Sequence, residues 1–120
     1  MTPPASLTTH VLDTAHGRPA AGLRIDLFAV DAGGGTRLVK TVTTNVDGRT
    51  DAPLLGPGEM DPGQYELRFH VGDYFRAADG AVTDAPFLDV VPVRFTAAAG
   101  RHHHVPLLVS PYGYTTYRGS

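Results

Sequence analysis

Short runs of alternating apolar and polar residues, separated by glycines and prolines, constrain this chain most. In the clearest run, from 64 to 71, one face carries Tyr65, Leu67, Phe69 and Val71, and the other carries Glu66, Arg68 and His70. Successive side chains of a β-strand point to opposite faces, so each such run predicts a half-buried strand. The 14 glycines and 10 prolines are spread along the 120 residues as turn signals.

The spacing of these runs predicts an all-β domain. We expect strands at 7–13, 23–30, 37–44, 49–52, 64–71, 89–96, 101–109 and 114–117, and a turn or two of helix at 72–78 with Asp73 as its cap. Many short strands at regular spacing are typical of a sandwich or barrel. The length suits a single domain, which we place at 7–120 after a flexible N-terminus at 1–6.

Composition excludes several classes of function. The formal net charge is -2, from 10 basic and 12 acidic residues mixed along the chain, which argues against binding to nucleic acid or to an anionic membrane. The chain has no cysteine, so disulfides, thiol catalysis and thiolate metal sites are excluded. No secretory signal or membrane-spanning run is visible, and we expect a cytoplasmic protein.

Histidine is the unusual residue of this chain, with six copies, three of them consecutive. On a strand, His102 and His104 share one face and His103 takes the other. His103 lies on the face of the apolar residues that follow it, so we expect it in the core and its two neighbours outside. His102 and His104 could bind zinc with His10 as a third ligand. No nearby carboxylate is spaced to add a further ligand, so we assign no metal.

Two further residues are candidates for chemistry. His10 lies on an alternating strand, where it is either a surface residue or a general base, since the pKa of histidine is close to neutral pH. Arg49 follows the turn signal Asn45-Val-Asp-Gly48. It is either a solvated cation at the start of a strand or a fixed cation that stabilises a developing oxyanion.

The C-terminal segment, from Tyr112 to Ser120, is rich in Tyr and Thr, which favour strands. Such a strand would bring Tyr117, Arg118, the Ser120 hydroxyl and the terminal carboxylate to one fixed place. These groups together suit a binding site. The alternative is an edge strand that only completes a sheet.

Four stretches of the sequence resemble a known family. They are Leu7-Thr-Thr-His-Val-Leu-Asp-Thr14, Gly17-Arg-Pro-Ala-Ala-Gly22, Thr44-Asn-Val-Asp-Gly-Arg49 and His104-Val-Pro-Leu-Leu-Val-Ser-Pro-Tyr-Gly-Tyr-Thr-Thr-Tyr-Arg-Gly-Ser120. They are similar to the 5-hydroxyisourate hydrolases, the transthyretin-like proteins of urate catabolism, over the chain from about Leu7 onward. The ending Tyr-Arg-Gly-Ser distinguishes these hydrolases from the transthyretin hormone carriers.

The resemblance implies a fold, an assembly and a site. The fold would be a transthyretin-like β-sandwich of two four-stranded sheets with one short helix. The assembly would be a homotetramer with active sites where two dimers meet, and no cofactor is implied. The catalytic residues would be His10, Arg49 and His104. The substrate, a small oxidised purine, would be bound by Tyr117, Arg118, Gly119 and Ser120.

The reaction implied by the resemblance is hydrolysis of 5-hydroxyisourate to 2-oxo-4-hydroxy-4-carboxy-5-ureidoimidazoline. His10 or His104 would deprotonate the attacking water, and the sequence leaves open which of them is the base. Arg49 would stabilise the oxyanion. The alternatives are a transthyretin-like carrier of a small ligand and a structural sandwich domain without activity.

Overall fold

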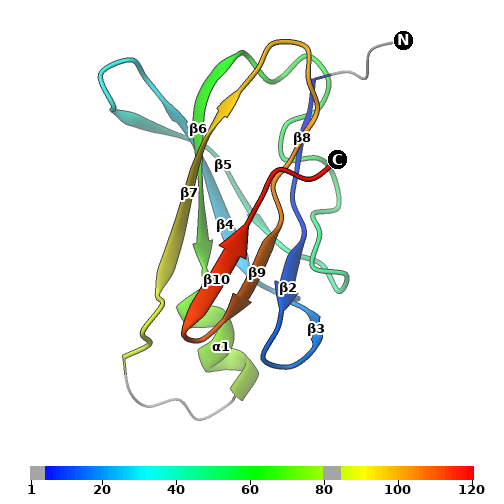
Figure 1. Cartoon of the computed structure of the whole chain (residues 1–120), viewed down its shortest axis with the longest axis vertical. Coiled ribbons are helices and arrows are strands. Elements are labelled where there is room, and N and C mark those ends of the chain that lie inside the picture. The colour runs from blue at the N-terminus through cyan, green and yellow to red at the C-terminus, as the bar shows by residue number, and fades with distance from the viewer. Residues whose placement is uncertain (1–4, 80–84) are drawn as a thin grey trace.

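The structure, a computed structural model, describes residues 5–79 and 85–120 as two stacked β-sheets with one helix at an end of the stack (Figure 1). The elements are β1 (Leu7–Thr8), β2 (Val11–Asp13), β3 (Arg18–Pro19), β4 (Arg24–Val30), β5 (Thr36–Thr43), β6 (Gly63–His70), α1 (Val71–Asp79), β7 (Val90–Ala97), β8 (His103–His104), β9 (Leu107–Ser110) and β10 (Gly113–Thr116). One sheet has the strand order β10-β9-β2-β3, and the other has the order β5-β4-β6-β7. The predicted sandwich of two four-stranded sheets with one short helix is confirmed.

A short parallel pair, β1 with β8, extends the first sheet at the end opposite the helix. The backbone N–H of Val105 donates to the Thr8 carbonyl over 2.9 Å, and that of Leu107 donates to the His10 carbonyl over 2.9 Å. The strands predicted at 7–13 and 101–109 are therefore each one extended segment in which the regular ladder is interrupted once.

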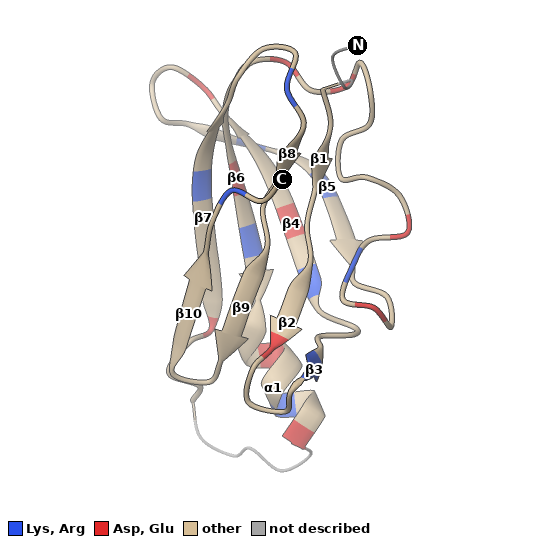
Figure 2. Ribbon diagram, turned by 45° about the vertical axis from the view of Figure 1, so that its right-hand side comes forward, with Lys and Arg blue, Asp and Glu red and all other residues tan. Residues whose placement is uncertain are grey.

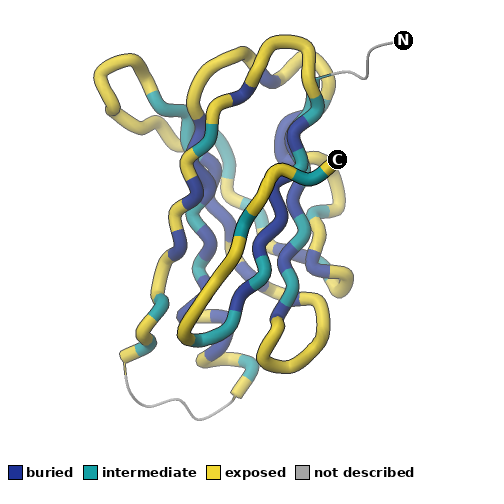
Figure 3. The backbone as a smooth tube through the Cα atoms, viewed as in Figure 1, coloured by how far each residue is buried: buried dark blue, intermediate teal, exposed yellow. Residues whose placement is uncertain are grey.

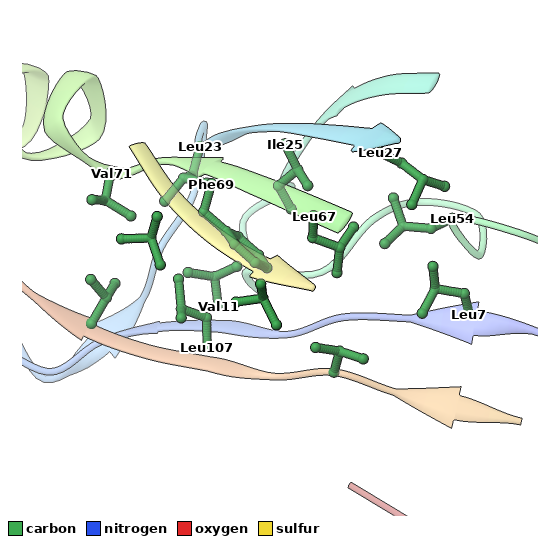
Figure 4. Packing of buried hydrophobic residues seen from close by; sticks show 14 of the residues in the cluster. Leu7, Val11, Leu23, Ile25, Leu27, Leu54, Leu67, Phe69, Val71 and Leu107 are labelled. Atoms are coloured by element: carbon green, nitrogen blue, oxygen red, sulfur yellow. The ribbon is translucent and has the colours of Figure 1, made fainter. Parts of the chain in front are cut away.

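The core lies between the two sheets, where the alternating residues of both meet (Figures 3 and 4). Among the fully buried side chains are Leu7, Val11, Leu23, Ile25, Leu27, Leu54, Leu67, Phe69, Leu107 and Val109. Burying one such side chain contributes about 1.5–3 kcal/mol, so this layer holds the strands in register. The inward face predicted for the strand at 64–71 is confirmed.

The prediction of a strand at 49–52 is wrong, because these residues lie in a loop that follows a tight turn at 45–48. The Asn45 side chain accepts the backbone N–H groups of Asp47 (2.9 Å) and Arg49 (3.2 Å), which closes the turn. Gly48 has a φ of 72° and lies against β2, where a Cβ would collide with the Val11 carbonyl oxygen. The turn therefore requires glycine, and it binds β2 through the bond from Val11 N–H to the Gly48 carbonyl (2.8 Å).

The helix begins at Val71, slightly before the predicted start, so Asp73 lies in the first turn and does not cap the helix. The helix is tied to the first sheet through His16, which follows β2. The His16 ring bonds the buried Asp13 carboxylate at Nδ1 (2.6 Å) and the Asp79 carboxylate at Nε2 (2.9 Å). The Tyr74 hydroxyl also donates to Asp13 (2.7 Å). The short strand β3 was not predicted, because two residues carry no readable alternation.

The two sheets differ in charge on their outer faces. Figure 2 shows charged residues on β4, β6 and β7, whereas β9 and β10 carry none. Glu66, expected on the exposed face, is buried there because Arg68 (2.7 Å) and Arg94 (3.0 Å) cover it. The part of the first sheet formed by β9 and β10 is thus less charged than the second sheet.

Two observations concern the ends of the chain and membranes. Residues 1–4 of the segment predicted to be flexible lie outside the described residues, and the carbonyl of Ser6 accepts the backbone N–H of His103 (2.8 Å). Within the described residues, no helix is both long enough and apolar enough to cross a membrane.

Candidate active site

His10 and His104 lie on the outer face of the first sheet, as predicted, and both are half-buried. They come from the parallel segments around β1 and β8, where Thr8 is the register partner of His104. His10 is two residues after Thr8 on the same face, so the two histidines are diagonal neighbours across the strand pair. The parallel pairing thus brings together two residues that are far apart in the sequence.

The Thr8 hydroxyl holds the His104 ring. Thr8 Oγ1 lies 2.8 Å from Nδ1 of His104 and 3.3 Å from Nε2 of His102. The other ring nitrogen of His102, Nδ1, lies 2.6 Å from Oγ of Ser6. Thr8 and Ser6 were not among the predicted site residues, although Thr8 shares the outer face of its strand with His10.

Arg49 is brought to this face by the loop at 45–55. The loop is bound to β2 at Gly48, as described above, and to β1 through the bond from Leu7 N–H to the Leu55 carbonyl (2.8 Å). Between these two anchors, a pocket of about 150 Å³ is lined by Thr8, Thr9, Arg49, Thr50, Asp51, Ala52 and Pro53. Arg49 is exposed, so its guanidinium is available to a ligand.

The C-terminal tail returns to His104. The β10–β9 ladder stops where Pro106 has no N–H to donate, and it resumes at the bridge between His104 and Gly119. Gly119 N–H donates to the His104 carbonyl over 2.8 Å. A Cβ on Gly119 would lie only 2.6 Å from Cδ2 of the His104 ring, so the tail and the ring can meet only because residue 119 is glycine.

The electrostatics of His104 depend on its burial and on the cationic groups near it. Burial lowers the pKa of the His104 imidazole below its usual value of 6.5, and the positive charges of Arg49, His102 and His10 lower it further. His104 is therefore a neutral imidazole at neutral pH. A neutral imidazole can accept a proton, and a nearby guanidinium can stabilise an anion.

Tyr117 and Arg118 lie on the other side of the tail. Both are exposed, and they border a separate hollow of about 200 Å³, whose lining includes Phe95, His103 and Val105. Ser120 is exposed at the end of the tail. Of the predicted tetrapeptide, Gly119 is thus the residue that this structure joins to His104, and no described contact joins Tyr117 or Arg118 to His10 or Arg49.

His103 belongs to the core, as predicted, with 4% of its surface exposed. Its Nε2 accepts the backbone N–H of Ala98 (3.3 Å), and its Nδ1 lies 3.1 Å from the Arg101 carbonyl. Both ring nitrogens are therefore occupied inside the fold. Within residues 5–79 and 85–120, no three histidine or carboxylate residues are grouped so as to hold a metal ion, and His102 and His104 share the Thr8 hydroxyl instead.

Comparison with known proteins places these features in a family. The model of the HIUase/Transthyretin family matches residues 7–119. A relative from Rhizobium meliloti (strain 1021), named 5-hydroxyisourate hydrolase 2, is 58% identical over 115 residues, which are 95% of each chain.

Two solved structures share the fold. The crystal structure of an (S)-allantoin synthase matches with a TM-score of 0.86 and 46% identity over 100% of this chain, which corresponds to only 46% of that longer chain. Sea bream transthyretin, solved in complex with thyroxine, matches with a TM-score of 0.83 and 28% identity over 96% of this chain and 95% of its own. The match over nearly the whole length shows that this chain belongs to the HIUase/Transthyretin family.

Proposed function

We propose that this chain hydrolyses 5-hydroxyisourate to 2-oxo-4-hydroxy-4-carboxy-5-ureidoimidazoline, a step of urate catabolism. The observation that carries the proposal is the neutral imidazole of His104, held by Thr8 on one edge, touched by Gly119 on another and influenced by the charge of Arg49. The relative named for this activity, at 58% identity, supports the same substrate.

In this proposal His104 is the general base. Its lowered pKa keeps Nε2 free to accept a proton from water at neutral pH, and the bond at Nδ1 fixes the orientation of the ring. The hydroxide attacks the acyl carbon of the ring amide. Arg49, exposed beside the pocket, stabilises the oxyanion, a contribution that typically reaches about 3–4 kcal/mol for one such donor.

His10 and the tail complete the proposed site. His10 shares the outer face with His104 and hydrogen-bonds to the substrate beside the reacting carbon. Tyr117, Arg118, Gly119 and Ser120 bind the heterocycle, whose carbonyl and ring nitrogen groups match a guanidinium, a hydroxyl and backbone N–H groups. Tyr117 and Arg118 reach the substrate by turning their exposed side chains toward it.

We also propose that the protein is a cytoplasmic homotetramer. The outer face around His104 is open in one chain, and a site open to bulk water weakens every electrostatic contribution. The same face lacks charge on β9 and β10 (Figure 2). A second copy placed against this face would exclude water from the site. Size-exclusion chromatography coupled to light scattering tests this, and a fully active monomer would contradict it.

A carrier of a small ligand is the second candidate, because the sea bream transthyretin bound to thyroxine has the same fold. A carrier does not require a neutral imidazole beside a guanidinium. The test generates 5-hydroxyisourate from urate with urate oxidase and follows its absorbance with and without this protein. The hydrolase proposal predicts faster decay at substoichiometric protein. A carrier would slow the decay or leave it unchanged, with an effect that saturates at one ligand per site.

A further inference from the structure

Four side chains, beginning with His104, are joined one to the next by hydrogen bonds. The order is His104 Nδ1, Thr8 Oγ1 (2.8 Å), His102 Nε2 (3.3 Å from Thr8) and, from His102 Nδ1, Ser6 Oγ (2.6 Å). Their polar atoms have no other described side-chain partners. Ser6, the last member, is half-buried and so keeps contact with solvent.

Counting protons shows that this row of hydrogen bonds can be fully formed in two ways. A hydroxyl has one hydrogen to donate, and each neutral imidazole has one N–H. In the first state His104 Nδ1–H donates to Thr8, Thr8 donates to His102 Nε2, and His102 Nδ1–H donates to Ser6. In the second state Ser6 donates to His102 Nδ1, His102 Nε2–H donates to Thr8, and Thr8 donates to His104 Nδ1. His104 has a free Nε2 in the first state and an Nε2–H in the second.

We propose that Thr8, His102 and Ser6 form a proton relay that switches His104 between its two neutral tautomers during hydrolysis. The inference rests on the proposed hydrolase function and extends it to residues that position His104 and exchange protons with it. A relay is useful here because an imidazolium at His104 would be disfavoured by burial and by the charge of Arg49.

In the first step, one O–H bond of water breaks and its proton moves to His104 Nε2, while the oxygen bonds the acyl carbon and the carbonyl becomes an oxyanion. The Nδ1 proton moves to Thr8, the Thr8 proton moves to His102 Nε2, the His102 Nδ1 proton moves to Ser6, and the Ser6 proton leaves to solvent. His104 remains neutral and now carries Nε2–H.

In the second step, the oxyanion reforms the carbonyl and the carbon–nitrogen bond breaks. The bonding pair stays on the ring nitrogen, which takes the proton of His104 Nε2. A solvent proton enters at Ser6 and the relay returns to its first state. The product carboxylic acid then loses its proton to solvent, so one water is consumed and one proton is released per turnover.

The main test compares Thr8→Val, which keeps the shape and removes the hydroxyl, with Thr8→Ser, which restores it. Thr14→Val is the matched control, because the Thr14 hydroxyl donates to the Val109 carbonyl (3.1 Å) at the other end of the same strand pair. Losing the partner that orients an imidazole typically costs about 10- to 100-fold in activity. We expect that loss in kcat for Thr8→Val, with little change in KM. Thr8→Ser should recover the wild-type kcat, and Thr14→Val should show no loss of kcat. Equal kcat for Thr8→Val and Thr14→Val would overturn the relay.

A second test separates proton transfer from simple support of the ring. His102→Gln keeps a hydrogen-bonding group but cannot pass a proton through a ring. Its kcat should fall at low buffer concentration and rise again as imidazole buffer is added, whereas wild-type kcat should not depend on the buffer. A His102→Gln variant with wild-type kcat in dilute buffer would contradict the relay.

The tautomer of His104 can be measured without any substrate. Nitrogen-15 NMR of the imidazole should show the Nδ1–H form in the wild type and the Nε2–H form in Thr8→Val. Identical tautomers in the two proteins would refute the relay even if the wild type hydrolyses 5-hydroxyisourate. A wild type without hydrolase activity would instead refute the proposed function, and the NMR comparison would still decide whether Thr8 sets the tautomer.

Discussion

Gly119→Ala gives the sharpest prediction about the site, because the structure fixes its magnitude. The added Cβ would lie 2.6 Å from Cδ2 and 3.3 Å from Cγ of His104. Carbon atoms in contact prefer about 3.5–4.0 Å, so the ring or the tail must move by about 1 Å. The ring is held on its other edge by Thr8, and the tail is held by the bond from Gly119 N–H to the His104 carbonyl.

A displacement of this size in a catalytic group typically costs about 100-fold in rate. If the tail moves instead, one backbone hydrogen bond worth about 0.5–1.5 kcal/mol is lost, which lowers Tm by only a few degrees. We therefore expect kcat/KM for 5-hydroxyisourate to fall about 100-fold while the protein stays folded.

The matched control is Gly113→Ala, at the start of β10 in the same C-terminal region. A Cβ there would meet only Ser110 Oγ, at 3.9 Å, which is an ordinary contact. Both variants are assayed by the absorbance decay of freshly generated 5-hydroxyisourate, with Tm measured by circular dichroism. Equal kcat/KM in the two variants would refute the contact between the tail and His104 as a determinant of activity.

Three further predictions concern charge and the tail. Arg49→Gln should lower kcat/KM by about 100- to 1,000-fold. It should also move the acidic limb of the pH profile to higher pH, because removing the guanidinium raises the lowered pKa of His104. An acidic limb that does not move would contradict the proposal that the two residues share a site. The hydrogen bond to Asp13 raises the pKa of His16, and the Asp79 carboxylate acts in the same direction. The stability that protonated His16 contributes is therefore complete below pH 6.5 and is lost as the pH rises through the raised pKa. The Tm difference between wild type and His16→Asn should thus be larger at acidic than at alkaline pH, and a constant difference would be inconsistent with this. A tag added after Ser120 should reduce activity far more than an N-terminal tag, at nearly unchanged Tm, whereas equal activities would exclude the tail from the site.

The alternation of the sequence was sufficient to predict the sandwich and the faces of most strands. Leu67 and Phe69 lie inside as expected, and His103 and His104 take opposite faces as their spacing requires. Alternation fails at Arg49, where a local turn closed by the Asn45 side chain replaces a strand. Glu66 is buried because arginines from β6 and β7 converge on it, and such convergence depends on strand order.

The site was predictable in its residue types and not in its connections. The three proposed catalytic residues came from the resemblance, and the sequence gives no sign that the Thr8 hydroxyl joins His104 to His102. That link depends on the parallel register of two segments about a hundred residues apart. The contact of Gly119 with the His104 ring has the same origin, since it depends on a ladder that resumes after Pro106.

The most direct test of this account measures kcat/KM and Tm for His104→Ala and His103→Ala side by side. The two residues are neighbours on one strand and face opposite ways. Removing a general base typically costs about 100- to 10,000-fold, so His104→Ala should lose that much kcat/KM at nearly unchanged Tm. His103→Ala removes two buried hydrogen bonds, which should cost about 1–3 kcal/mol of stability while the folded protein keeps most of its activity. A His104→Ala variant that hydrolyses 5-hydroxyisourate at the wild-type rate would contradict the account.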